Sequence, residues 1–171
     1  DEALKAIDRL QEKTPNSALT HVLRGQVYLQ RSDPGAARSA FERAMVVDSG
    51  YYPATKWLVS MDVREGKFNE AIDRLNAYAA KEPRNYVALE TLTRLQLRSG
   101  VPSDVVRRSL SEAVNRQPGD VQARLLLVDF LLGSKDTSAA LAAAQQGVSA
   151  FPGDLEMMDA LGRAQVAAGE T

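Results

Sequence analysis

The chain has 171 residues, of which 44% are hydrophobic, 25% charged and 6% aromatic, and its formal net charge is -1. These fractions are typical of a folded protein and exclude intrinsic disorder. The near-zero charge removes the global electrostatic case for nucleic-acid binding. The absence of cysteine excludes disulfides and thiolate metal sites.

The sequence predicts no membrane-spanning segment. Its longest stretch without a charged residue, residues 137–153, contains Gln145, Gln146 and Pro152. A transmembrane helix needs about 20 mostly apolar residues, so this stretch does not qualify.

Turn residues recur along the chain at a spacing of 34 residues, which indicates an internal repeat. Pro15, Pro83, Pro118 and Pro152 share one context, and the turn-forming triplet 48–50 fills the interval that lacks a proline. Between these turns, apolar residues recur at helical offsets of three and four.

Taken in chain order, the pattern predicts a helix over 1–14, four pairs of helices, and a last helix over 155–168. We call the first helix of each pair helix A and the second helix B. One interval, from Pro83 to Pro118, is 35 residues long. We expect the extra residue in the turn over 99–104, because loops tolerate insertions better than helices. The columns that define helix B are Ala37, Ala71, Val106 and Ala140, and Phe41, Leu75, Leu110 and Ala144.

These residues resemble the tetratricopeptide repeat (TPR) family. The 34-residue unit, the small residue near the start of helix B and the closing proline all match. The best single unit is 18–51, which has Gly25, Tyr28, Ala37 and Phe41 in the family positions. The repeats also depart from the family pattern: within unit 18–51, His21 occupies the Trp position and Arg24 a Leu position, and in the next unit Asp62 occupies the Tyr position.

The resemblance implies an all-α fold, an α-solenoid of helix-turn-helix hairpins wound as a right-handed superhelix. Residues 1–171 then form a single array of four full repeats flanked by two half repeats. The expected bounds are 1–17 for a lone helix B, 18–51, 52–85, 86–120 and 121–154 for the full repeats, and 155–171 for a lone helix A.

The sequence shows no pattern typical of an enzyme, a cofactor site or a metal site. His21 is the only histidine, and no nucleophile motif, P-loop or dinucleotide fingerprint accompanies it. A structural histidine on the surface or in the groove is the favoured interpretation of His21, and packing is the favoured interpretation of Trp57. Asp154 is expected to cap the last helix.

In TPR proteins the A helices line a concave face that binds a protein or peptide partner, and the resemblance implies the same here. The charge along the chain is uneven: residues 84–116 hold six arginines against three acids, and residues 117–171 hold three basic residues against seven acidic ones. Arg64, Arg94 and Arg98 form a candidate ladder for an anionic partner, and the alternative is a solvated face. The candidate partner-binding residues are Gln26, Gln30, Lys56, Ser60, Arg64, Glu90, Arg94, Arg98, Asp129 and Arg163.

Both ends of the array are expected to leave apolar side chains partly bare. At one end these are Ala3, Leu4, Ile7 and Leu10, and at the other Met157, Met158, Leu161 and Val166. Two interpretations remain open: end-to-end association between chains, or a piece cut from a longer protein.

The amino-acid sequences of residues 23–29 and 161–169 also resemble the bacterial TPR-repeat lipoprotein of the PEP-CTERM (exosortase) system, which is linked to exopolysaccharide export. This resemblance implies a non-catalytic scaffold in a bacterial envelope, in a parent protein that is periplasmic or anchored to the outer membrane. The alternatives are a cytoplasmic peptide-binding adaptor and the substrate-recruiting arm of a larger enzyme.

Overall fold

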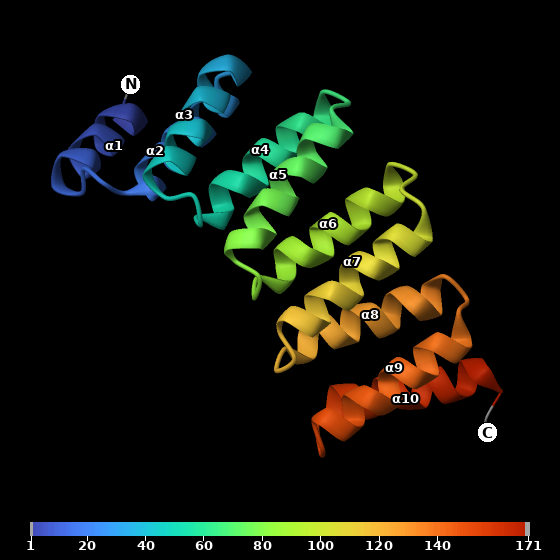
Figure 1. Ribbon diagram of the computed structural model, residues 1–171. Helices are drawn as coiled ribbons and strands as arrows, with labels where there is room; N and C mark the ends of the chain where they lie inside the picture. The colour runs from blue at the N-terminus through green and yellow to red at the C-terminus, as the bar shows by residue number, and fades with distance from the viewer. Residues whose placement is uncertain (1, 170–171) are drawn as a thin grey trace. The chain divides into compact units, whose positions relative to one another are not determined.

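The computed structural model describes residues 2–169, and every regular element in that range is an α-helix (Figure 1). The chain divides into two compact units, Asp1–Glu82 and Pro83–Thr171. The first unit contains α1 (Glu2–Lys13), α2 (Ala18–Gln30), α3 (Pro34–Val47), α4 (Tyr52–Arg64) and α5 (Phe68–Lys81). The second contains α6 (Tyr86–Arg98), α7 (Ser103–Arg116), α8 (Val121–Gly133), α9 (Thr137–Ala150) and α10 (Leu155–Ala168).

Consecutive helices pack as hairpins, so each unit has the architecture of an α-solenoid, as the sequence predicted. Helices α2, α4, α6, α8 and α10 are the A helices, and the other five described helices are the B helices. The outermost bounds expected for the two half repeats, residues 1, 170 and 171, lie outside the described residues.

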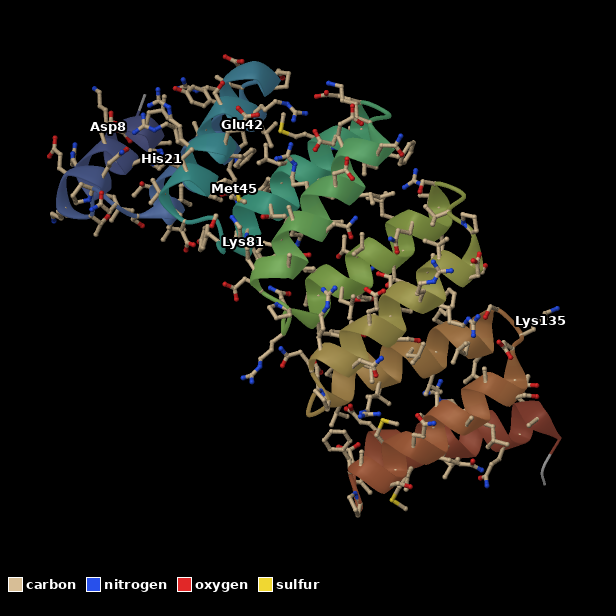
Figure 2. The ribbon with its side chains drawn as sticks, viewed as in Figure 1. Asp8, His21, Glu42, Met45, Lys81 and Lys135 are labelled. Atoms are coloured by element: carbon tan, nitrogen blue, oxygen red, sulfur yellow. The ribbon has the colours of Figure 1, made fainter. Side chains whose placement is uncertain are left out.

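The links between the helices are nearly uniform in length. Within a hairpin, the links 31–33, 65–67 and 134–136 have three residues, whereas 99–102 has four. The inserted residue therefore lies in the turn where the sequence placed it. The second residue of each link has a positive φ: Ser32, Gly66, Gly100 and Lys135. Gly169, which lies 34 residues after Lys135, also has a positive φ. Glycine adopts this conformation without the steric cost that Ser32 and Lys135 bear, and Figure 2 shows Lys135 at the tip of its link.

Acidic and amide side chains cap five of the described helices. Asp154 Oδ1 accepts a hydrogen bond from the Met157 amide at 2.9 Å, which confirms the predicted cap of α10. The other side-chain caps are Asp33, Asn85, Asp120 and Asp136.

Phe41 occupies the centre of the first unit's core. It is fully buried and stacks on Trp57 with a ring-centroid distance of 5.5 Å. This stacking confirms the packing role expected for Trp57. A Cβ atom added to Gly25 would overlap the Phe41 ring. Glycine at this position is therefore required by the close approach of α2 and α3.

The second unit is built around Val106, Leu110 and Val128, together with small residues of α9 and α10. Here the structure corrects one expectation, because Met157 is fully buried and not partly bare. Gly147 of α9 has no side chain, and a Cβ there would overlap Met157 Cε. The missing side chain makes the space that Met157 fills.

The other end residues follow the expectation only in part. Ile7 of α1 is buried, whereas Ala3 is exposed. On α10, Met158 and Val166 are 51% and 69% exposed, and Leu155, which the sequence analysis did not single out, is 79% exposed.

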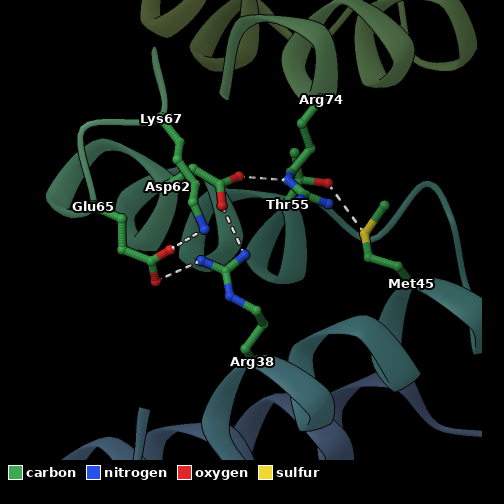
Figure 3. A network of polar contacts seen from close by, with 7 residues as sticks. All are labelled: Arg38, Met45, Thr55, Asp62, Glu65, Lys67 and Arg74. Carbon is green, nitrogen blue, oxygen red and sulfur yellow. Dashed lines mark hydrogen bonds and ion pairs between the residues drawn. The ribbon is translucent and has the colours of Figure 1, made fainter. Parts of the chain in front are cut away.

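A buried carboxylate joins three helices of the first unit (Figure 3). The Asp62 side chain on α4 is 2% exposed and accepts hydrogen bonds from Arg38 of α3 at 2.7 Å and from Arg74 of α5 at 3.0 Å. Glu65 extends the network, because it pairs with Arg38 at 2.8 Å and with Lys67 at 2.7 Å. Those two contacts lower the pKa of Glu65, with the hydrogen bond from Lys67 the larger cause.

We expect two glycines at the same repeat position to respond oppositely to alanine. Gly25→Ala forces a methyl group into the buried Phe41 ring, and overpacking costs about 1–3 kcal/mol, which exceeds the gain of about 1 kcal/mol in helix propensity. A Cβ at Gly162 meets nothing within 4 Å, so Gly162→Ala keeps the propensity gain. Urea unfolding should show a lower midpoint for the first variant and a higher one for the second. Equal shifts of both midpoints would contradict the packing argument.

The Asp62 network gives a second prediction. Arg38→Met with Arg74→Met leaves a buried carboxylate without either cation, and breaking a buried ion pair costs about 3–5 kcal/mol. Adding Asp62→Leu removes the stranded charge, so we expect the triple variant to regain most of the lost stability. The measurement is the free energy of unfolding in urea. If the triple variant is no more stable than the double, the loss comes from packing and not from the buried charge.

Candidate functional site

In the second unit the A helices lie side by side, with α8 in contact with both α6 and α10. Their polar side chains form what we call the polar row. Its members are Glu90 and Arg94 on α6, Gln122 and Asp129 on α8, and Glu156, Asp159 and Arg163 on α10.

Residues 34 apart in the sequence meet across neighbouring helices of this row. Arg163 donates a hydrogen bond to Asp129 at 2.7 Å, and Gln122 donates one to Glu156 at 2.9 Å. The structure thus brings together two predicted site residues, Asp129 and Arg163, that occupy the same position in successive repeats. The hydrogen bond to Asp129 is the main reason that the pKa of Arg163 is raised.

The remaining contacts of the row lie within single helices. Arg94 pairs with Glu90 at 3.2 Å on α6, and Arg163 also pairs with Asp159 at 2.9 Å on α10. Tyr86, at the start of α6, faces the row: burial raises its pKa most, and the charges of Glu90 and Asp129 raise it further.

The charged groups of the polar row are open to solvent. The Arg94 side chain is 70% exposed, and the Asp129 and Arg163 side chains are 50% and 47% exposed. Exposed ion pairs contribute little to stability, typically about 0–1 kcal/mol. These pairs can therefore be exchanged for contacts with a partner at small cost to the fold.

The predicted residues of the first unit lie on α2 and α4, which are in contact with each other. Gln26 and Ser60 are half-buried, whereas Gln30, Lys56 and Arg64 are exposed. Among the described residues, no hydrogen bond joins the α2 set to the α4 set.

The candidate arginine ladder is divided between the two units. Arg64 belongs to the first unit, and Arg94 and Arg98 belong to the second. Arg94 and Arg98 are both exposed on α6, and the Arg94 guanidinium contacts Glu90. The role of these arginines in binding stays a prediction.

His21 lies in a buried position, whereas the sequence favoured a structural histidine on the surface or in the groove. It is 8% exposed, and burial lowers its pKa most, followed by the positive charges of Arg24 and Arg43.

Asp62 and Arg24 are the polar residues that sequence reasoning left without partners. Arg24 pairs with Asp8 of α1 at 2.7 Å. The sequence signal for Asp62 and Arg24 was a charged residue at a position of the repeat that is apolar or aromatic in the family.

Within residues 2–169, no group of three or more histidine, aspartate or glutamate side chains is placed to bind a metal ion. In the same range, no helix combines the length and apolar character needed to cross a bilayer.

The helical hairpins and the close contact of residues 34 apart define a helical-repeat protein. The sequence profile of the tetratricopeptide repeat family matches residues 1–53 and 107–154. The chain belongs to the tetratricopeptide repeat family.

Several solved structures share this fold. YrrB, described as a TPR protein with an unusual peptide-binding site, is 16% identical with a TM-score of 0.55, over 98% of this chain and 86% of that one. PilF of Pseudomonas aeruginosa is 14% identical with a TM-score of 0.57, over 96% and 74%. TTC0263, a thermophilic TPR protein of Thermus thermophilus, is 18% identical with a TM-score of 0.52, over 90% and 84%. No curated protein sequence matches the chain. At these identities the likeness shows the fold alone.

Proposed function

We propose that this chain is a non-catalytic scaffold that binds a protein or peptide partner along its A helices. The observation that carries the proposal is the polar row, in which equivalent residues of successive repeats lie within hydrogen-bond distance yet stay half exposed. A segment laid across α6, α8 and α10 would meet the same type of surface at each helix. Membership of the TPR family supports this, because such repeats act as interaction modules.

The charge along the A helices of the second unit favours a partner with its own charge pattern. On α6 the arginines Arg94 and Arg98 are exposed, whereas α10 carries Glu156 and Asp159. Complementary charges orient a partner and speed its encounter with the surface. The proposed contact residues are Gln26, Gln30, Lys56, Ser60, Arg64, Glu90, Arg94, Arg98, Asp129 and Arg163.

The biological setting that we propose is a bacterial envelope system for polysaccharide export or protein sorting. The support is the resemblance of residues 23–29 and 161–169 to the lipoprotein of the PEP-CTERM system. A signal peptide with a lipid-bearing cysteine upstream in the parent gene, and fractionation of the parent with the envelope, would test this. A parent in the cytoplasmic fraction would favour the adaptor or the recruiting arm of an enzyme.

We also propose that α10 mediates self-association. Leu155, Met158 and Val166 are exposed and lie on one face of that helix, because their spacing returns them to the same side. The bare side of Gly162 lies on the same face, with nothing within 4 Å of its Cβ position.

For partner binding, the test is the double variant Arg94→Glu/Arg98→Glu and a fluorescently labelled acidic peptide. We expect the peptide affinity, measured by fluorescence anisotropy, to fall by about tenfold or more, since one lost charge-assisted hydrogen bond suffices for that factor. The matched control is Arg107→Glu/Arg108→Glu on α7, a B helix, where both arginines are exposed. Equal losses of affinity in both variants would show that net charge alone causes the effect, and no loss of affinity in either would refute the A-helix site.

For self-association, the test is sedimentation velocity over a range of concentrations. We expect the wild-type chain to form dimers as concentration rises, and Met158→Lys/Val166→Lys to stay monomeric because two buried cations are costly. Val46→Lys on α3 is the control, since Val46 is 87% exposed and lies far from α10 in the sequence. A wild-type chain that remains monomeric throughout would rule out this contact.

A further inference from the structure

A cavity of about 420 Å³ opens between α1, α2 and α3 in the first unit. Its volume is in the range of small-molecule and side-chain binding pockets. Six of the residues that line it carry polar groups: Gln11, His21, Arg24, Tyr28, Ser39 and Arg43.

This cavity is separate from the proposed partner-binding face. On α2, His21, Arg24 and Tyr28 follow one another at offsets of three and four, so they share one side of the helix. Gln26 and Gln30 fall on the opposite side, because they lie about half a turn away from that stripe. A ligand in the cavity would therefore leave the A-helix face free.

His21 is a buried polar side chain in the lining of the cavity. Its Nδ1 is buried and has no hydrogen-bond partner among the described residues. A buried polar atom without a partner costs about 1–3 kcal/mol, and such atoms are uncommon in folded proteins. A neutral imidazole carries one proton, and with Nδ1 enclosed the proton is better placed on Nε2, where a ligand can accept it.

The arginines of the cavity are not equivalent. Arg24 donates hydrogen bonds to Asp8 at 2.7 Å and to Gln11 at 3.0 Å, so its charge is already compensated. Arg43 is exposed and has no ion pair among residues 2–169. The sum over Arg24, Arg43 and Asp8, with His21 neutral, is one positive charge.

We propose that this cavity binds a carboxylate group of a protein or peptide, with Arg43 as its principal cation and His21 as a second donor. A single positive charge matches a monoanion and leaves the second charge of a phosphate ester unbalanced. The Arg43 guanidinium can engage both carboxylate oxygens, and the Ser39 hydroxyl adds a donor beside it. The carboxylate can come from an acidic side chain or from a chain end, which share this chemistry.

Carboxylate binding should also change the titration of His21. The charged groups that face the imidazole are Arg24 on its own helix, Arg43 from α3, and Asp8 from α1 through its pair with Arg24. The arginines and burial together lower the His21 pKa. A bound carboxylate offsets the arginine charges and raises that pKa, so binding takes up protons. Affinity must then rise as the pH falls through the interval between the two pKa values, and level off above it.

The chain has one histidine, so its imidazole NMR signals report on this cavity without ambiguity. The probes are acetyl-Ala-Glu-Ala-amide, which has a side-chain carboxylate, acetyl-Ala-Ala-Ala, which has a terminal carboxylate, and acetyl-Ala-Gln-Ala-amide, which has neither. We expect saturable shifts of the His21 signals with the first probe, the second or both, a raised His21 pKa in the complex, and no saturation with the third. The carboxylate probe that binds more tightly identifies the source of the carboxylate as a side chain or a chain end.

Arg43→Gln should weaken carboxylate binding by about tenfold or more, and Arg107→Gln on α7 is the matched control with unchanged binding. The proposal is overturned if neither carboxylate probe saturates, if the glutamine probe or sodium chloride at equal ionic strength gives the same shifts, or if Arg43→Gln binds as the wild type does. Because Arg94 and Arg98 belong to the other unit, their variants separate a failure of this site from a failure of the A-helix face.

Discussion

Each helix of this chain is stabilised by burial of one apolar stripe that it cannot cover alone. Ala37, Phe41 and Ala44 on α3 are fully buried because α2 and α4 enclose them. Close approach of the helices needs small residues at defined points, and Gly25 against Phe41 is one of these. Since the same stripe recurs every 34 residues, each hairpin both supports and needs its neighbours. Packing therefore fixes the spacing of the helices and leaves their outer faces free to vary.

The outer faces carry the polar groups that packing does not constrain. The polar row of the second unit consists of exposed, weakly stabilising pairs, so its residues can change with little effect on folding. The Asp62 network has the opposite character, because a buried carboxylate bound by Arg38 and Arg74 is tied to the stability of three helices. The two arrangements use the same residue types, and burial alone decides which of them can change with little effect on stability.

The sequence was sufficient to predict the helices, their pairing and the inserted residue near Gly100, because these depend on local periodicity and turn residues. It was not sufficient for contacts that depend on a neighbour's shape. Met157 is buried because Gly147, on another helix, has no side chain. Asp62 was visible as a charged residue at an aromatic position, but its partners lie 24 and 12 residues away on two different helices. The cavity beside His21 likewise depends on where α1 packs, which no local pattern determines.

The contact between Asp129 and Arg163 also has a consequence for any extended ligand. Packed helices lie about 8–10 Å apart, and an extended chain advances about 3.3 Å per residue. A strand-like segment laid across α6, α8 and α10 would therefore meet a new helix with about every third residue. In the proposed binding mode the surface would act as a ruler, contacting its partner at intervals of about three residues and leaving the residues between them without contact.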